Sequence, residues 1–145
     1  MRLTAFTDFA LRALMRLADE PDRSFSTNEI ATAFGISRNH LIKVVRDLAD
    51  SGFVITQRGV GGGFRLARPP QSITLGEVVR ALEERHPLVE CFRDDGGECA
   101  LTPRCRLKAQ LAAAQEAFMR ELDKTTVAEC AYPGRPKGRP VPSAA

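Results

Sequence analysis

The chain of 145 residues has no apolar run close to the ~20 residues that a membrane-spanning helix requires. Its first residues, Met1 to Thr4, do not form the apolar stretch of a secretory signal peptide. We therefore expect a cytoplasmic protein with no membrane partner, in a compartment that keeps thiols reduced. The length suits one domain, or a small domain with an extension, and excludes large barrels and two-domain enzymes.

The net charge is only +3, and its distribution along the chain says more than its size. Residues 1–70 contain ten Lys and Arg against seven Asp and Glu, whereas residues 71–130 contain eight against eleven. Between residues 38 and 68 there are six basic residues and two acidic ones. A basic N-terminal half is typical of a nucleic-acid-binding module joined to a second region, although a charge-mixed, solvated surface is the commoner cause of such a balance.

The apolar spacing in the first seventy residues predicts three helices followed by a β-hairpin. The helices are expected over residues 8–19, from Ser26 to Phe34 and over residues 38–51, with Ser26 and Glu29 forming a reciprocal capping box and Ser37 capping the third helix. Strands are expected over residues 53–57 and 64–66. This order predicts a mainly α fold with a small β-hairpin wing, a winged helix-turn-helix.

The third predicted helix has the composition of a DNA-reading helix. Leu41, Val44 and Leu48 form its buried stripe. The candidate DNA-binding residues lie on other faces or at its start: Ser37, Arg38, Asn39, His40, Lys43 and Arg46. Arg and Asn are the residue types that pair with guanine and adenine edges in the major groove. Considered alone, the pattern fits a solvated amphipathic helix equally well, and the segment that follows favours DNA.

That segment is a basic, glycine-rich hairpin loop. Four of the five residues from 59 to 63 are glycine, and we assign Arg58, Gly62, Gly63 and Arg65 to DNA binding, with Arg68 as a further basic residue of the wing. These arginines would contact phosphate or the minor groove. A nucleotide-binding phosphate loop is a poor alternative, because no Lys-Ser/Thr pair follows and no helix starts there.

The second half of the chain predicts a connecting segment and a long helix. A capping box at Thr74 and Glu77 starts a helix that runs to about residue 85, and an irregular stretch covers residues 86–102. A helix over residues 103–126 would begin at Thr102-Pro103. One face of this helix carries an apolar stripe, namely Leu107, Leu111, Ala114, Phe118 and Leu122.

We interpret this stripe as a dimer interface, because a two-fold partner presents the same stripe. The alternative is a core helix that covers the cysteine-containing stretch of its own chain. The predicted organisation is therefore a DNA-binding domain over residues 1–70, a connecting helix and cysteine-rich loop over 71–102, a dimerisation helix over 103–128 and a disordered basic tail over 129–145.

Cys91, Cys99 and Cys105 are separated by seven and five residues and contain no CxxC pair, which argues against an ordinary zinc ribbon. Thiolates are the ligands of iron–sulfur clusters, so the spacing fits a cluster or a set of redox thiols about equally well. Three thiolates leave one iron of a cubic cluster without a cysteine ligand. The fourth cysteine, Cys130, borders the tail and is interpreted as a bystander.

These segments resemble the NsrR/IscR family of winged-helix iron–sulfur repressors, and within it the branch that senses nitric oxide. The resemblance runs from Met1 to about Glu129 and is carried by long motifs. They are Leu3-Thr4-x-Phe6-Thr7-Asp8, Leu11-Arg12-Ala13-Leu14, Ser37-Arg38-Asn39-His40, Arg58-Gly59-x-x-Gly62-Gly63-x-Arg65-Leu66 and Cys99-x-Leu101-Thr102-Pro103-x-Cys105-Arg106-Leu107.

The resemblance implies a homodimeric repressor, not an enzyme, that binds a palindromic double-stranded DNA operator. It also implies that Cys91, Cys99 and Cys105 bind the cluster, that Asp8 of the other subunit completes it, and that nitric oxide destroys it. With Asp8 as the fourth ligand, a 4Fe–4S cluster is favoured over a 2Fe–2S cluster. From the residues alone, Asp8 would instead be the N-cap of the first helix. IscR-like relatives use a histidine shortly after the third cysteine, and residues 106–109 contain none. The seven residues between Cys91 and Cys99 are somewhat more than expected for the nitric-oxide-sensing branch.

Two other functions stay open from the sequence. The nearer one is a regulator that responds to iron or to iron–sulfur supply, since such relatives also carry three cysteines. The other is a thiol redox protein or iron–sulfur carrier, which the missing CxxC motif and the DNA-reading half oppose.

Overall fold

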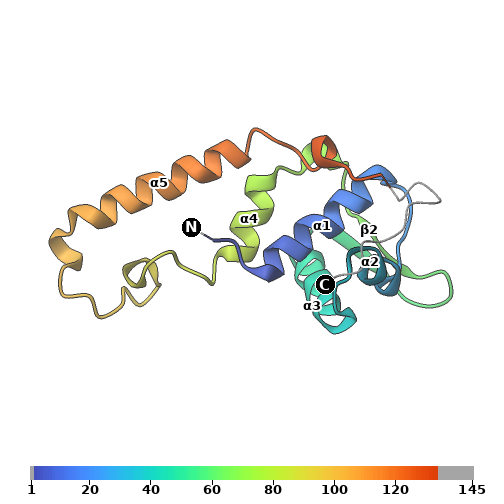
Figure 1. Ribbon diagram of the computed structural model, residues 1–145, viewed down its shortest axis with the longest axis horizontal. Coiled ribbons are helices and arrows are strands. Elements are labelled where there is room, and N and C mark those ends of the chain that lie inside the picture. Colours follow the sequence, from blue (N-terminus) through green and yellow to red (C-terminus); the bar gives the residue numbers. More distant parts are fainter. Residues whose placement is uncertain (1, 134–145) are drawn as a thin grey trace.

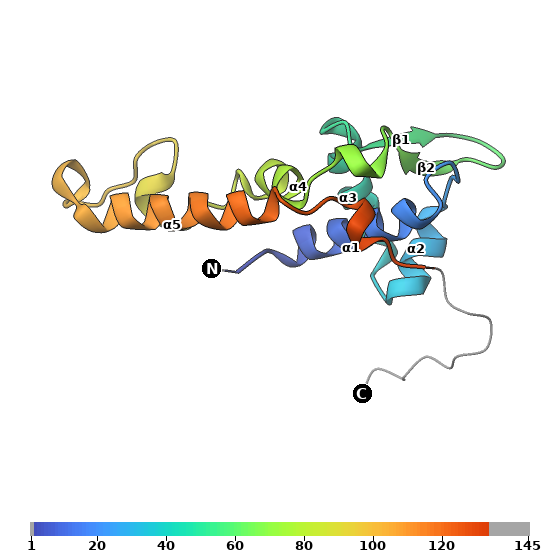
Figure 2. The same ribbon diagram turned by 90° about the horizontal axis from the view of Figure 1, so that it is seen from above.

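A computed structural model describes residues 2–133. The chain forms a head, residues 2–74, from which a long helical arm extends (Figures 1 and 2). The head contains α1 (Ala5–Asp19), α2 (Thr27–Phe34), α3 (Arg38–Asp50), β1 (Val54–Gln57) and β2 (Gly63–Leu66). Helix α4 (Leu75–Glu83) connects the head to the cysteine loop, residues 84–105, and α5 (Arg106–Leu122) forms the arm. The mainly helical fold with a two-stranded antiparallel wing is confirmed.

The head is held together by one hydrophobic core in which aromatic rings from three different segments meet. Phe25, Phe53 and Phe64 are each at most 2% exposed and pack with apolar side chains from α1, α2 and α3. The stripe predicted for the third helix is buried as expected, since Leu41, Val44 and Leu48 are fully covered. Gly35 ends α2 in the left-handed conformation, with φ of 63°, which permits the sharp turn into α3.

The wing is a hairpin, and a third segment of the chain pairs with its second strand. Val54 pairs with Leu66 and Gln57 with Gly63, which fixes the antiparallel register. Phe25 then exchanges two backbone hydrogen bonds with Phe64, each of 2.9 Å, so the segment before α2 adds an isolated bridge to β2. Position 63 must be glycine, because a Cβ there would lie 2.3 Å from the Phe25 carbonyl oxygen.

The predicted long helix is shorter than expected at both ends. Thr102 and Pro103 belong to a separate 3₁₀ turn, and Cys105 occupies the N-cap of α5, so the predicted cap at Thr102 is wrong. At the other end Asp123 caps the helix and accepts two hydrogen bonds of 2.7 Å from Arg80 of α4. This tertiary contact leaves a helix of 17 residues, about 25 Å long at 1.5 Å per residue.

Residues after α5 return to the head as an ordered strap, which we define as residues 125–132. Val127 is fully buried in the core of the head and donates a hydrogen bond from its amide to the Ile73 carbonyl. Tyr132 donates from its amide to the Met15 carbonyl, and its ring lies 5.9 Å from that of Phe34. The disordered tail predicted from residue 129 is therefore wrong for residues 129–132; residues 134–145 lie outside the described part of the chain.

Candidate DNA-reading surface and cysteine loop

The polar face of α3 is open to solvent along its length. The predicted reading residues Ser37, Arg38, Asn39, His40, Lys43 and Arg46 are all exposed, and the ring of His40 lies 6.4 Å from that of Phe9 on α1. Ser37 occupies the N-cap position but makes no side-chain capping bond, so its predicted capping role is wrong. The free amides at this helix start and the unoccupied Ser37 hydroxyl can both face a phosphate.

Cations of this surface differ in whether they are already paired. Among residues 2–133, Arg38, Lys43, Arg58 and Arg65 take part in no ion pair, and Arg46 approaches Asp47 only at 3.8 Å. Arg68 is paired, since it donates to the Glu77 carboxylate and the Ser72 carbonyl and stacks over the Phe53 ring. Unpaired cations can neutralise phosphate without first breaking an internal contact, so Arg68 is a weaker candidate than Arg58 or Arg65.

The glycines of the wing allow its loop to form a compact turn. A Cβ at position 62 would lie 2.4 Å from the Gln57 carbonyl oxygen, so Gly62 allows the loop to close on β1. Gly59 and Gly61 have φ of 99° and 76°, which L side chains rarely adopt. The loop therefore presents Arg58 and the fully exposed Val60 on a compact turn.

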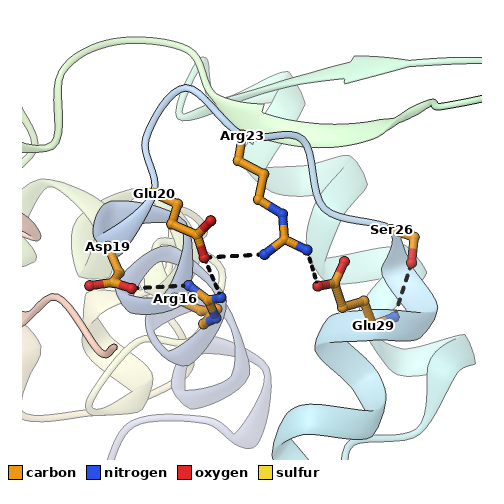
Figure 3. A network of polar contacts seen from close by, with 6 residues as sticks. All are labelled: Arg16, Asp19, Glu20, Arg23, Ser26 and Glu29. Atoms are coloured by element: carbon orange, nitrogen blue, oxygen red, sulfur yellow. Dashed lines mark hydrogen bonds and ion pairs between the residues drawn. The ribbon is translucent and has the colours of Figure 1, made fainter. Parts of the chain in front are cut away.

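A polar network behind the wing fixes the segment that carries Phe25 (Figure 3). The guanidinium groups of Arg16 and Arg23 lie 4.6 and 4.3 Å from the centre of the Phe25 ring, and both donate to Glu20. The hydrogen bond from Arg16 holds the pKa of Glu20 below its usual value. Arg23 also pairs with Glu29, whose carboxylate is thus turned away from Ser26, and the reciprocal half of the predicted capping box is absent there. At the second predicted box, Glu77 likewise pairs with Arg68.

The cysteine loop carries three free thiols on a backbone with little regular structure. Cys91, Cys99 and Cys105 are partly exposed and form no disulfide. Cys91 lies within the 3₁₀ turn Glu90–Phe92, and a second 3₁₀ turn, Thr102–Arg104, lies between Cys99 and Cys105. Gly96 and Gly97 form a turn with positive φ. Within residues 2–133 no three His, Cys, Asp or Glu side chains are close enough to hold a metal ion, so the structure does not gather the three thiols.

Asp8 lies in the first turn of α1 and is close to half exposed. It pairs with Arg12 at 2.7 Å, and it is not the helix cap, because Thr4 occupies that position and accepts from the Thr7 amide. Sequence reasoning missed Arg12, although the spacing of four residues to Asp8 pointed to this pair.

Sequence reasoning also missed the contact that holds this end of α1 against α4. Glu83 accepts hydrogen bonds of 2.8 Å from both the amide and the hydroxyl of Thr4. Burial raises the pKa of Glu83, but the hydrogen bonds from Thr7 and Thr4 outweigh it, so the pKa lies below its usual value. Thr4 and Glu83 are 79 residues apart, and no local pattern could have linked them.

The predicted stripe on α5 is largely uncovered. Leu107 is 64% and Phe118 36% exposed, Ala114 is exposed, and Leu111 and Leu122 are partly exposed. Met119, on a neighbouring face, is the residue of α5 that is buried. The alternative prediction, a core helix covered by its own chain, is therefore not supported by the described residues.

The chain is similar to known regulators along most of its length. The model of the Rrf2 family, described as an iron-dependent transcriptional regulator, matches residues 3–132. The chain is 48% identical over 131 residues to the HTH-type transcriptional regulator NsrR of Geobacillus kaustophilus (strain HTA426), covering 89% of this chain and 88% of that protein.

Solved structures share the fold. IscR of T. potens aligns with a TM-score of 0.70 at 23% identity, over 89% of this chain and 85% of that one. CymR of B. subtilis, the global cysteine regulator, aligns with a TM-score of 0.69 at 26% identity, over 90% and 96%. None of the helices within residues 2–133 is long and apolar enough to cross a membrane.

Proposed function

Because the chain belongs to the Rrf2 family of transcriptional regulators, we propose that it is a cytoplasmic, dimeric repressor whose iron–sulfur cluster senses nitric oxide. One observation carries the proposal: the chain combines an exposed surface of basic side chains on α3 and the wing with three free thiols on one loop. The similarity to NsrR over 89% of the chain supports this assignment. Loss of the cluster would relieve repression of genes for nitric-oxide stress.

The residues of the cysteine loop fit an iron–sulfur cluster by their chemistry. Cys91, Cys99 and Cys105 are partly exposed, unpaired thiols, and thiolates are the usual ligands of such clusters. The hydroxyl oxygen of Thr102, between the last two cysteines, is buried without a hydrogen-bond partner in residues 2–133, as expected for a loop that closes around a bound group. A 4Fe–4S cluster has one iron more than these thiolates, and Asp8 of the partner subunit would supply its ligand. When bound, the cluster supplies iron that reacts with nitric oxide.

The arrangement of α1 provides a route from this site to the DNA-reading helix. Asp8 and Phe9 are neighbours on α1, and the Phe9 ring contacts the His40 ring on α3. An Asp8 held by the other subunit would fix the position of α1, and with it the angle at which α3 meets the groove. Such a coupling needs to favour the DNA-binding geometry by only about 1–3 kcal/mol.

The exposed stripe on α5 would pair with its copy in a second subunit. A two-fold dimer of this kind places two α3 helices in a symmetric relation, so the operator would be palindromic. It also brings Asp8 of one subunit within the same assembly as the cysteine loop of the other, as the proposed ligand set requires.

The proposal is tested by titrating the anaerobically purified protein on DNA with nitric oxide and, separately, with an iron chelator. We expect a brown protein that is released from DNA by nitric oxide at about one cluster equivalent of reagent or a small multiple, while the chelator acts slowly. Release by the chelator alone would identify an iron-responsive regulator. Turnover with a thiol or electron donor and no DNA binding would identify a redox protein or carrier.

The ligand set is tested by substitution. Asp8→Ala should keep a cluster, because three thiolates remain, but change its Mössbauer or resonance Raman spectrum and weaken DNA binding. Cys91→Ala, Cys99→Ala and Cys105→Ala should each lose the cluster more completely, and Cys130→Ala should resemble the parent protein. An Asp8→Ala protein with unchanged spectrum and affinity would leave Asp8 only its ion pair with Arg12.

A further inference from the structure

Ile42 is an apolar side chain in the middle of the polar face of α3. It is 43% exposed, whereas the leucine and valine residues of its helix, Leu41, Val44, Val45 and Leu48, are at most 7% exposed. On a helix, residues three and four apart are neighbours, so Ile42 lies beside Arg38, Asn39 and Arg46. It is therefore surrounded by the side chains that are proposed to read and contact DNA.

Among residues 2–133, Ile42 belongs neither to the buried core of the head nor to the partly buried apolar residues that pack against that core. The core of the head lies against the opposite side of α3, where Leu41 and Leu48 are fully buried. An exposed apolar side chain contributes little to stability, and polar residues occupy the equivalent exposed positions at 39, 43 and 46. The position of Ile42 among the proposed DNA-contacting side chains is therefore best explained by contact with a ligand.

The major groove offers one apolar group to such a side chain, which is the C5-methyl group of thymine. Arg38 and Asn39 carry donors suited to guanine and adenine, and neither can recognise a methyl group. We propose that Ile42 is a specificity-determining residue that contacts a thymine methyl group next to the base contacted by Arg38 or Asn39. The inference rests on the proposed DNA binding and deepens it, because it names the base that one residue recognises.

The test uses deoxyuridine, which differs from thymidine only by the missing methyl group. A duplex of about 30 base pairs is first selected from a random-sequence pool by the full-length protein, purified without oxygen, with a length that covers two half-sites one helical turn apart. Each thymine is then replaced in turn by deoxyuridine, and affinity is measured by fluorescence anisotropy. We expect a three- to fivefold loss at one symmetry-related pair of positions, the size expected for removing one buried methyl from an apolar contact.

Ile42→Ala should remove that loss, so that thymine and deoxyuridine bind the variant equally at the sensitive positions. Ile42→Val, which keeps a branched side chain, should retain most of it. Ile55→Ala is the matched control, because Ile55 is 45% exposed but lies on β1 of the wing, and it should keep the full thymine preference.

The outcomes separate this inference from the proposed function. If the wild-type protein selects no sequence from the pool, DNA reading itself is wrong. If it selects a sequence but Ile42→Ala keeps the thymine preference, or Ile55→Ala loses it, Ile42 is not the residue that reads the methyl group.

Discussion

At the scale of single residues, the reading surface contains two kinds of arginine that differ in their surroundings. Arg38 is exposed at the first turn of α3, where a side chain can reach base edges, and Arg65 is exposed on β2 of the wing, next to the glycine loop. Neither arginine takes part in an ion pair within residues 2–133, so replacing either one should remove its proposed DNA contact without disturbing the fold.

We predict that Arg38→Ala weakens binding to the selected duplex by about 1–3 kcal/mol and relaxes its sequence preference, as the loss of a base contact does. Arg65→Ala should weaken all DNA more evenly and reduce the slope of log affinity against log salt by about one, as the loss of a phosphate contact does. Salt titrations on specific and random duplexes measure both effects. A change of specificity alone in Arg65→Ala would contradict a backbone role for the wing.

A second prediction at this scale concerns Glu83 and its hydrogen bonds from Thr4. Its pKa in the folded state is lowered, so the ionised carboxylate stabilises the fold above its unfolded pKa, and this contribution disappears as the pH falls through the folded pKa. Glu83→Gln should therefore cost about 1 kcal/mol at neutral pH and progressively less below about pH 4. Urea unfolding at fixed protein concentration measures the difference. A cost that does not change with pH would mean that the charge is irrelevant.

At the scale of elements, α4 and α5 meet at a joint with almost no spare space. A Cβ at Gly76 would lie 2.0 Å from Asp123 Oδ1 and 2.9 Å from the Met119 carbonyl oxygen. Asp123 is held in place by Arg80, whose hydrogen bonds also keep the pKa of Asp123 below its usual value. The close approach of the two helices therefore depends on glycine at position 76.

Gly76→Ala tests this joint, because helix propensity and the clash change the free energy of unfolding in opposite directions. Helix propensity alone would stabilise α4 by up to about 1 kcal/mol, whereas the clash with the backbone of α5 should destabilise the protein by about 1–3 kcal/mol. Thermal unfolding of the parent protein and of Gly76→Ala shows which of the two effects is larger. A more stable variant would show that the joint can open without cost.

The elements that could be predicted from sequence are those fixed by local patterns. The buried stripe of α3, the end of α2 at Phe34 and the glycine loop all follow from residues close together in the chain. What could not be predicted depends on distant partners: Arg80 ends α5 at Asp123, Arg23 takes Glu29 away from its capping role, and Thr4 finds Glu83. For the same reason the cysteines could be identified by type and spacing, but their arrangement in space could not.

At the scale of the whole molecule, the arm has an apolar surface that the described chain does not cover. Phe118→Asp should dissociate the proposed dimer, because a charge would be buried at the centre of the stripe, and most of the head should stay folded. Ala113→Asp is the control, since Ala113 is exposed on the same helix away from the stripe. Light scattering and far-UV circular dichroism measure assembly and folding. A dimeric Phe118→Asp protein would place the interface elsewhere.

The strap over residues 125–132 has a consequence for the protein during its synthesis. The core of the head is complete only when Val127 has left the ribosome, and by then the cysteine loop has already been translated. A nascent or prematurely terminated chain that lacks the loop also lacks part of the core that supports α1. Incomplete copies are therefore expected to bind DNA poorly, so under the proposed function fragments without the cysteine loop would not occupy an operator.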